Sequence, residues 1–289
     1  MKQSRLRIVR VLILFWVLAA FCAVNFAQIS VPKPKRVITL APSLGELVAD
    51  FLGNDLSRIV GVSEYTDYPP ALKSFPSVGS YAQFSLEKVL SLKPDLVFAT
   101  MDGNPRDTVL HLKELGVPVV IVKTESLGAI QESIRQVADA LGMPEKGQQM
   151  AAQLQRGIDR LKADVGSSSP KVMLQIADQP LIVAGKKSFL NDALEILGAK
   201  NIYADSELPY PKPSFEDVLR KNPDVIIIAA MGDDATLFRA MATRWLEFKT
   251  LNAVKNHRVY LVQSDALLRP TLRILEGLSV LKKVIYEKK

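Results

Sequence analysis

The stretch SLEKVLSLKPDLVFA at residues 85–99 returns as SFEDVLRKNPDVIIIA at residues 214–229, with serine, glutamate, Val-Leu and Pro-Asp at the same offsets. A serine can cap the start of a helix, and an acidic residue in the first turn suits the helix dipole. Apolar residues at helical spacing follow, until a proline ends the helix because it lacks a backbone donor. The apolar run after Pro-Asp has the length of a buried parallel strand. Each copy therefore predicts a short helix, a tight turn and a core strand.

The surroundings of the two copies also match, which favours two similar lobes. Apolar strands are predicted before the copies at residues 36–40 and 171–175, and after them at residues 117–122 and 258–262. The copies lie much farther apart than the roughly 20–50 residues of a solenoid repeat. The alternative is that helix, Pro-Asp and strand recur by chance, as they can in any α/β protein. The sequence predicts an α/β fold of two lobes, each with a central, mostly parallel sheet.

The stretch between the lobes predicts helices. One helix is expected at residues 130–141 and a second at residues 145–165, where apolar residues recur at helical spacing. The second would span roughly 30 Å at 1.5 Å per residue and would join the lobes stiffly. The predicted division is an N-terminal lobe at residues 36–127, linking helices at residues 128–169 and a C-terminal lobe at residues 170–289.

Residues 1–27 have the pattern of a secretory signal peptide. A basic stretch from Lys2 to Arg10 precedes an apolar run from Val11 to Val24. That run is short for a membrane span, which needs about 20 residues. An uncleaved N-terminal anchor is the alternative. Residues 28–35 are expected to form a proline-containing leader. The basic and then apolar pattern of residues 1–27 predicts an exported protein.

The composition is that of a packed globular protein, with 48% hydrophobic and 23% charged residues. The formal net charge of +7 overstates the basicity of the folded part, because Lys2, Arg5, Arg7 and Arg10 lie in the signal segment. Without these four basic residues the net charge is +7 − 4 = +3, which gives no indication of a nucleic-acid partner. Cys22, the only cysteine, also lies in that segment, so the folded part must be stable without a disulfide.

Motifs of enzyme chemistry are absent from the sequence. It has no Gly-x-Gly-x-x-Gly, no P-loop and no Gly-x-Ser-x-Gly. The two histidines fall in different predicted lobes, His111 in a helix and His257 in a turn, so we expect no metal site. Paired-carboxylate hydrolysis stays open, but no pair stands out. Asp67, Asp102, Asp233 and Asp265 all follow strands, where polar loop residues are ordinary. We expect a protein that is not an enzyme.

Loop tyrosines are the stronger functional signal. In open α/β sheets, ligands bind beyond the carboxyl ends of the strands. A tyrosine held by neighbouring prolines offers rigid, flat contact area with a polar tip. Each tyrosine alone could simply pack its own loop, but the set indicates a ligand-binding surface. Its members are the tyrosines Tyr65, Tyr68, Tyr81 and Tyr210, together with Phe84.

With these residues identified, the chain resembles the class III periplasmic binding proteins that import metal chelates, and most of all the members that bind cobalamin. The resemblance covers about Arg36 to Ile285. The segments that carry it are RVITLAP (36–42), GVSEYTDYPP (61–70), residues 85–97, NIYADS (201–206), PYP (209–211) and residues 264–270. Among these, the run around Tyr65 is fairly specific, whereas the repeat is shared with siderophore and haem binders.

The resemblance implies that cobalamin or a related corrinoid is held between two lobes joined by one long helix. The corrinoid would be transported cargo, with no intrinsic cofactor. Tyr65 and Tyr81 would line the first wall and Tyr210 the second, with Asp265 and Arg269 adding contacts from the second lobe.

The resemblance further implies a partner and a location. The protein would work in the periplasm and deliver its ligand to the permease dimer of an ABC importer. Glu87 and Glu216 would each dock onto one half of that permease. We expect the binding protein itself to be a monomer.

Three departures from the family bear on the ligand. Tyr81 and Tyr210 stand where cobalamin binders have tryptophan, Ala266 stands where another would be, and the second-lobe disulfide of the family cannot form. Because aromatic walls set ligand identity, an iron siderophore or haem is the alternative ligand. An envelope enzyme or a sensor with an empty cleft are further alternatives. A siderophore binder would need basic side chains in the cleft, for which the candidates are Arg106, Arg244, Arg269 and Arg273.

Overall fold

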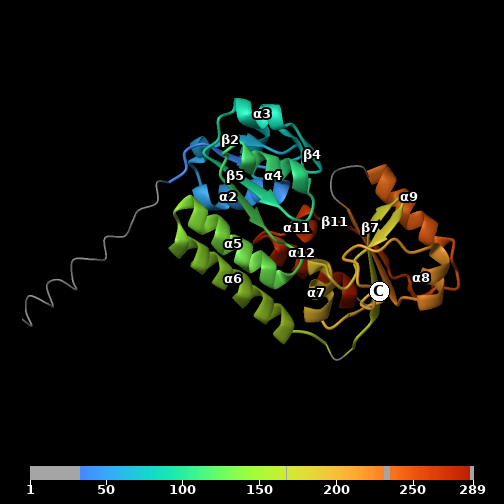
Figure 1. Cartoon of the computed structure of the whole chain (residues 1–289). Coiled ribbons are helices and arrows are strands. Elements are labelled where there is room, and N and C mark those ends of the chain that lie inside the picture. The colour runs from blue at the N-terminus through green and yellow to red at the C-terminus, as the bar shows by residue number, and fades with distance from the viewer. Residues whose placement is uncertain (1–32, 167, 231–234, 287–289) are drawn as a thin grey trace, which may run out of the picture. The chain divides into compact units, whose positions relative to one another are not determined.

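The structure, a computed structural model, describes residues 33–286 apart from residue 167 and residues 231–234 (Figure 1). The predicted signal segment, residues 28–32 of the leader and the loop Gly232-Asp233-Asp234 lie outside the described residues.

The first lobe is built on a four-stranded parallel sheet in the order β2-β1-β5-β6. Its central strands are buried on both faces, which explains why they are uninterrupted apolar runs. The strands are β1 (Val37–Thr39), β2 (Ile59–Val62), β5 (Leu96–Thr100) and β6 (Val119–Val122). The other elements of the lobe are α2 (Pro42–Leu52), the hairpin β3 (Gly79–Ser80) and β4 (Gln83–Phe84), α3 (Leu86–Ser91) and α4 (Arg106–Glu114).

The second lobe repeats this plan. Its parallel strands lie in the order β9-β7-β10-β11, which matches the first sheet strand for strand, and β8 adds an antiparallel edge to β7. The strands are β7 (Lys171–Asp178), β8 (Leu181–Val183), β9 (Lys200–Asn201), β10 (Val225–Ala230) and β11 (Val259–Gln263). The helices are α7 (Phe189–Ile196), α8 (Phe215–Lys221), α9 (Ala235–Leu246), α10 (Asn252–Lys255), α11 (Asp265–Leu268) and α12 (Ile274–Tyr286).

The repeated stretch has the predicted structure in both lobes. Ser85 caps α3 and Ser214 caps α8, each by accepting a hydrogen bond from a backbone N–H three residues on. The aspartate of each Pro-Asp dipeptide makes a hydrogen bond that the sequence pattern alone did not reveal. The carboxylate of Asp95 accepts the backbone N–H of Arg36 at 2.8 Å, and that of Asp224 accepts the N–H of Lys171 at 2.9 Å. Each aspartate thus ties the turn before one strand to the start of the neighbouring strand.

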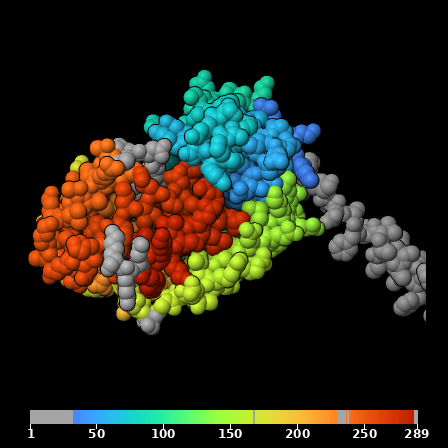
Figure 2. All heavy atoms as spheres, turned by 180° about the vertical axis from the view of Figure 1, so that it is seen from behind, coloured from blue at the N-terminus to red at the C-terminus, as the bar shows by residue number. Residues whose placement is uncertain are grey.

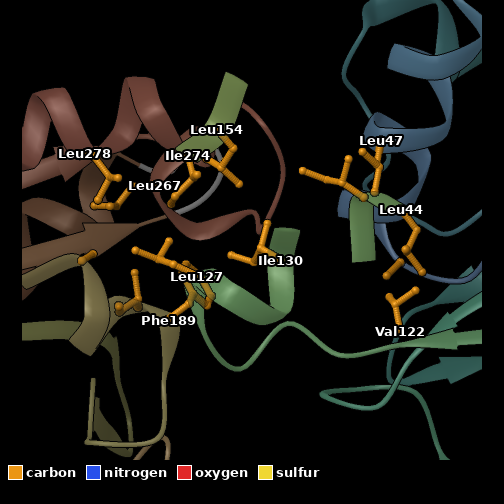
Figure 3. Packing of buried hydrophobic residues seen from close by; sticks show 14 of the residues in the cluster. Leu44, Leu47, Val122, Leu127, Ile130, Leu154, Phe189, Leu267, Ile274 and Leu278 are labelled. Atoms are coloured by element: carbon orange, nitrogen blue, oxygen red, sulfur yellow. The ribbon is translucent and has the colours of Figure 1, made fainter. Parts of the chain in front are cut away.

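Two helices and one continuous core join the lobes. α5 (Leu127–Leu141) and α6 (Pro144–Ala163) run side by side along both lobes (Figure 1). One cluster of buried side chains passes from α2 in the first lobe through α5 and α6 to α7, α11 and α12 in the second (Figure 3). The opposite face of each sheet has a cluster of its own. The expectation of two lobes linked by a long helix is therefore confirmed.

Several predicted element boundaries were wrong, and local chemistry explains them. A serine such as Ser43 could cap a helix, but α2 already begins at Pro42, which suits a first helical position. α5 begins at Leu127, not at residue 130, since Ser126 caps it by accepting from the N–H of Ala129. The last helix, α12, begins at Ile274. Within the described ranges, no helix is both long enough and apolar enough to cross a membrane.

Candidate functional site

The loop after β2 presents Tyr65 to solvent. Its side chain is 72% exposed, and its backbone has a positive φ of 63°, which is rare for a tyrosine. The buried hydroxyls of Ser63 and Thr66 hydrogen-bond to each other within the loop, at 2.9 Å. Arg269 of the second lobe donates to the Tyr65 carbonyl at 3.4 Å. A strained backbone that exposes an aromatic ring is typical of a ligand-binding position.

Tyr81 of the first lobe and Tyr210 of the second lie near enough for their charges to interact. Tyr81 precedes β4, and its ring lies against Gly103, where any larger residue would collide with it. Burial, with smaller contributions from the charges of Asp102 and Tyr81, raises the pKa of Tyr210 to about 12. Both groups therefore lie close to Tyr210, so residues that follow β3 and β5 in one lobe face the loop before α8 in the other.

Asp102 is a functional candidate that sequence reasoning passed over as an ordinary loop residue. Its carboxylate accepts the backbone N–H and the hydroxyl of Thr124, at 2.8 and 2.5 Å. The neighbouring Asn104 donates to the carbonyls of Leu40 and Tyr81, at 2.8 and 2.7 Å. These bonds tie together the carboxyl ends of β1, β5 and β6. The signal in the sequence was the Asp-Gly-Asn run directly after a core strand.

Arg269 connects the lobes through its guanidinium group, which is 7% exposed. Its Nη2 lies 3.0 Å from Asp265 on its own helical turn, and its Nη1 lies 2.7 Å from Asp67 of the first lobe. Asp265 and Arg269, both predicted to contact the ligand, thus pair with each other. On the face seen in Figure 2, the red C-terminal part of the chain meets the blue and cyan first lobe. Arg269 and its partners are part of that contact between lobes.

Two of the other three candidate arginines, Arg273 and Arg244, are also engaged. Arg273 stacks over Tyr68, with its Cζ 3.6 Å from the ring centre. Arg244 pairs with Asp178 at 3.1 Å and lies over the ring of Phe215. Arg106 is exposed at the start of α4. The arginines nearest the tyrosines are therefore neutralised by carboxylates of the protein itself.

Glu87 and Glu216 occupy equivalent positions, each the second residue of its helix, and both are exposed. A hydrogen bond from its own backbone N–H, and another with Ser214, hold the pKa of Glu216 below its usual range, so this acid is charged at neutral pH. α3 and α8 lie in different lobes, and both are remote from α5 and α6 (Figure 1). The two acids are thus matched sites on the outer ends of the two lobes.

Helix α2 contains two acidic residues, Glu46 and Asp50. Burial raises the pKa of the Glu46 carboxyl, an effect opposed by the Thr271 hydroxyl and by two arginines. Burial also raises the pKa of the partly buried Asp50 to about 6, with a further contribution from the charge of Glu46. The ordinary value for Asp50 is 3.8.

We expect Asp50→Asn to stabilise the protein at pH 7. Because the folded pKa is raised, the favourable contribution of Asp50 is complete below pH 3.8 and is lost as the pH rises through about 6. With allowance for partial exposure, the gain of the variant at pH 7 is about 1 kcal/mol and vanishes near pH 4. Urea denaturation at both pH values measures it, with the exposed Asp139→Asn on α5 as control. Equal stability of wild type and Asp50→Asn at both pH values would contradict the prediction.

The chain matches the family model described as periplasmic binding protein over residues 37–266. This chain belongs to the periplasmic binding protein family. The vitamin B12-binding protein of Vibrio cholerae serotype O1 is 32% identical over 269 residues, which cover 92% of this chain and 95% of that protein. The vitamin B12-binding protein of Salmonella typhi is 37% identical over 195 residues, or 67% and 72% of the two chains.

Solved structures of the family share the two-lobe fold. The periplasmic vitamin B12 binding protein BtuF of Vibrio cholerae has a TM-score of 0.76 at 31% identity, covering 87% of this chain and 96% of that one. The periplasmic haem-binding protein RhuT of Roseiflexus sp. RS-1 has a TM-score of 0.75 at 26% identity, covering 87% and 98%. Family membership points to a role in binding rather than catalysis. Among the described residues, no group of three or more histidine, cysteine or acidic side chains could hold a metal ion.

Proposed function

We propose that this protein captures cobalamin or a related corrinoid between its two lobes and delivers it to an ABC importer. The observation that carries the proposal is the approach of Tyr81 and Tyr210 from opposite lobes, with the exposed Tyr65 beside the same inter-lobe contact. A corrinoid is a large, flat ring with a rim of carboxamide groups. Tyrosines suit such a ligand, since their rings pack on its apolar faces and their hydroxyls can bond to its rim.

The charges at this face favour a ligand without strong net negative charge. Arg269 is matched by Asp67 and Asp265, and Asp102 adds a further carboxylate beside Tyr210. Haem and most ferric siderophores carry carboxylates or other anionic groups, which are best met by cationic side chains that the protein leaves uncompensated. Arg269 and Arg273 are already compensated by carboxylates of the protein, which supports a corrinoid over these two ligands. The names of the relatives support the same choice.

Haem is the second candidate ligand. It is supported by the similarity to the haem-binding RhuT, which is nearly as close in structure as the vitamin B12 binder. The replacement of family tryptophans by Tyr81 and Tyr210 also makes the walls of the site less typical of a cobalamin binder.

The matched acids, the N-terminal segment and the family together support the rest of the cycle. Glu87 and Glu216 would meet the two halves of a permease dimer, one acid per lobe. The basic and then apolar residues 1–27 would export the chain to the periplasm, where it would act as a monomer. Within this proposal the protein performs no catalysis, and cobalamin is its cargo.

The proposal is tested by titrating the purified protein with cobalamin and with haemin. We expect calorimetry to show saturable binding of one cobalamin per chain, and the bound fraction to keep the visible spectrum of a corrinoid. Haemin added at the same concentration should not displace it. Tight binding of haemin with no binding of cobalamin would contradict the proposal and favour the second candidate.

A further inference from the structure

Glu46 is a buried acid of the first lobe whose described partners all come from the second lobe. It lies on α2 and none of its surface is exposed. Its Oε1 accepts a hydrogen bond from the Thr271 hydroxyl at 2.5 Å. Its Oε2 accepts one from Nη1 of Arg273 at 3.1 Å and lies 3.6 Å from Nη1 of Arg269. The carboxylate thus hydrogen-bonds two residues and pairs with a third, all within residues 269–273 of the other lobe.

The two arginines that contact Glu46 also hold the tyrosine loop after β2. Arg269 pairs with Asp67 at 2.7 Å and donates to the carbonyl of Tyr65. Arg273 covers the ring of Tyr68 with its guanidinium plane. Glu46 is therefore linked to this loop through two side chains of the second lobe. A change in the Glu46 carboxylate would act on the contacts of both arginines.

Stability alone is a poor explanation for a charge at this position. Glu46 lies on the buried side of α2 among Leu44, Leu47 and Val48, where an apolar residue would also fit the helix. Replacing a buried ion pair by apolar residues is often neutral or stabilising, and the best-attested use of such groups is to select one arrangement over others. Directional bonds at both carboxylate oxygens fix the position of the second lobe in a way that apolar contacts do not.

We propose that Glu46 is a positioning residue for ligand binding, which sets the spacing of the two lobes and the placement of the Tyr65–Tyr68 loop through Arg269 and Arg273. The effect on affinity rests on the function proposed above, whereas the effect on lobe spacing does not require a ligand. Glu46 does not itself touch the bound molecule in this proposal. Its role is to reduce the number of arrangements that the empty protein samples.

The spacing of the lobes is tested without ligand by electron-spin distance measurements. Spin labels are placed at Lys113→Cys on α4 and Lys249→Cys after α9, both exposed, in a chain carrying Cys22→Ser. We expect one narrow distance distribution, which becomes broad or shifts in Glu46→Gln. Gln keeps an acceptor for Thr271 but lacks the charge that binds the arginines. The control is Leu47→Ala, which opens a cavity next to Glu46 without touching these bonds. A distribution unchanged by Glu46→Gln overturns the proposal.

Ligand binding provides the second readout. We expect Glu46→Gln to weaken cobalamin binding at least fivefold, and Arg273→Lys, which keeps the charge but loses the stack on Tyr68, to weaken it in the same direction. Leu47→Ala should lower the melting temperature but leave affinity within twofold. Equal affinity in wild type and Glu46→Gln would reduce Glu46 to a structural role and overturn the proposal. If the wild type fails to bind cobalamin, the proposed function is wrong and the distance distributions alone decide the role of Glu46.

Discussion

Cobalamin affinity is expected to fall about tenfold or more when Tyr210 is replaced by alanine, and by a similar factor for Tyr81→Ala and for Tyr65→Ala. An aromatic residue at the centre of a binding surface typically contributes 2 kcal/mol or more, and each 1.4 kcal/mol is a factor of ten. Tyr81 and Tyr210 lie close together, so the double variant should lose less than the sum of the two free energies. Isothermal titration calorimetry measures each value.

A tyrosine elsewhere in the chain supplies the control. Tyr286 ends α12, about 18 Å along the helix from Ile274, and its hydroxyl donates to the carbonyl of Leu197 at 2.6 Å. Tyr286→Ala should leave affinity unchanged. Tyr81→Trp and Tyr210→Trp should retain binding, since tryptophan supplies a larger aromatic face. If all three alanine variants bind cobalamin as tightly as wild type, the ligand site is elsewhere.

Uptake of cobalamin is expected to drop by an order of magnitude or more in the double variant Glu87→Ala, Glu216→Ala, with ligand affinity nearly unchanged. Each acid lies on an exposed helix start in a different lobe, so a permease of two like halves would meet one acid with each half. Loss of both removes the matched charges from the docking surface. The remaining association should depend less on salt, because exposed charges are screened beyond about 10 Å at 0.1 M ionic strength. Transport into vesicles containing the importer measures uptake.

The competing explanation for these acids is local helix stabilisation, and α6 offers a matched control. Glu145 is also an exposed acid in a first turn, but its helix is not part of the repeat. Loss of a first-turn acid typically costs about 0.3–1 kcal/mol through the helix dipole. Glu145→Ala should show that small loss of stability and full uptake. Wild-type uptake by the double variant at limiting protein concentration would leave helix capping as the sufficient role.

Local patterns predicted the lobes well because the repeat combines signals that act within a few residues. Ser85 and Ser214 cap helices, and the residues before Pro94 and Pro223 end them with positive φ values of 47° at Lys93 and 45° at Asn222. The antiparallel strand β8 was not predicted. It has only three residues and directly follows the turn at Pro180, so it leaves no clear pattern in the sequence.

Contacts between lobes could not be predicted from local patterns. Asp102 lies beside Tyr210 although the two are more than a hundred positions apart, and nothing near either residue encodes the other. Glu46 looked like an ordinary polar residue of an amphipathic helix, and its burial depends on arginines that follow 223 and 227 positions later. By contrast, Asp265 and Arg269 lie one helical turn apart, and an acid and a base at that spacing are expected to pair.

The core shared by the lobes means that neither half of the chain is a self-sufficient folding unit. A cut in the connection between α6 and β7 would give two fragments, each with its own complete parallel sheet. The first would expose Leu127, Ile130 and Leu154 to water, and the second Phe189, Leu267 and Leu278, all of which are buried in one cluster in the intact chain. Each fragment alone would tend to aggregate through its exposed apolar surface. The apolar surfaces of the two fragments would be complementary to each other. Reassembly of the severed chain would then restore the tyrosine-lined face, which makes this junction a natural place to divide the protein into a two-part sensor for its ligand.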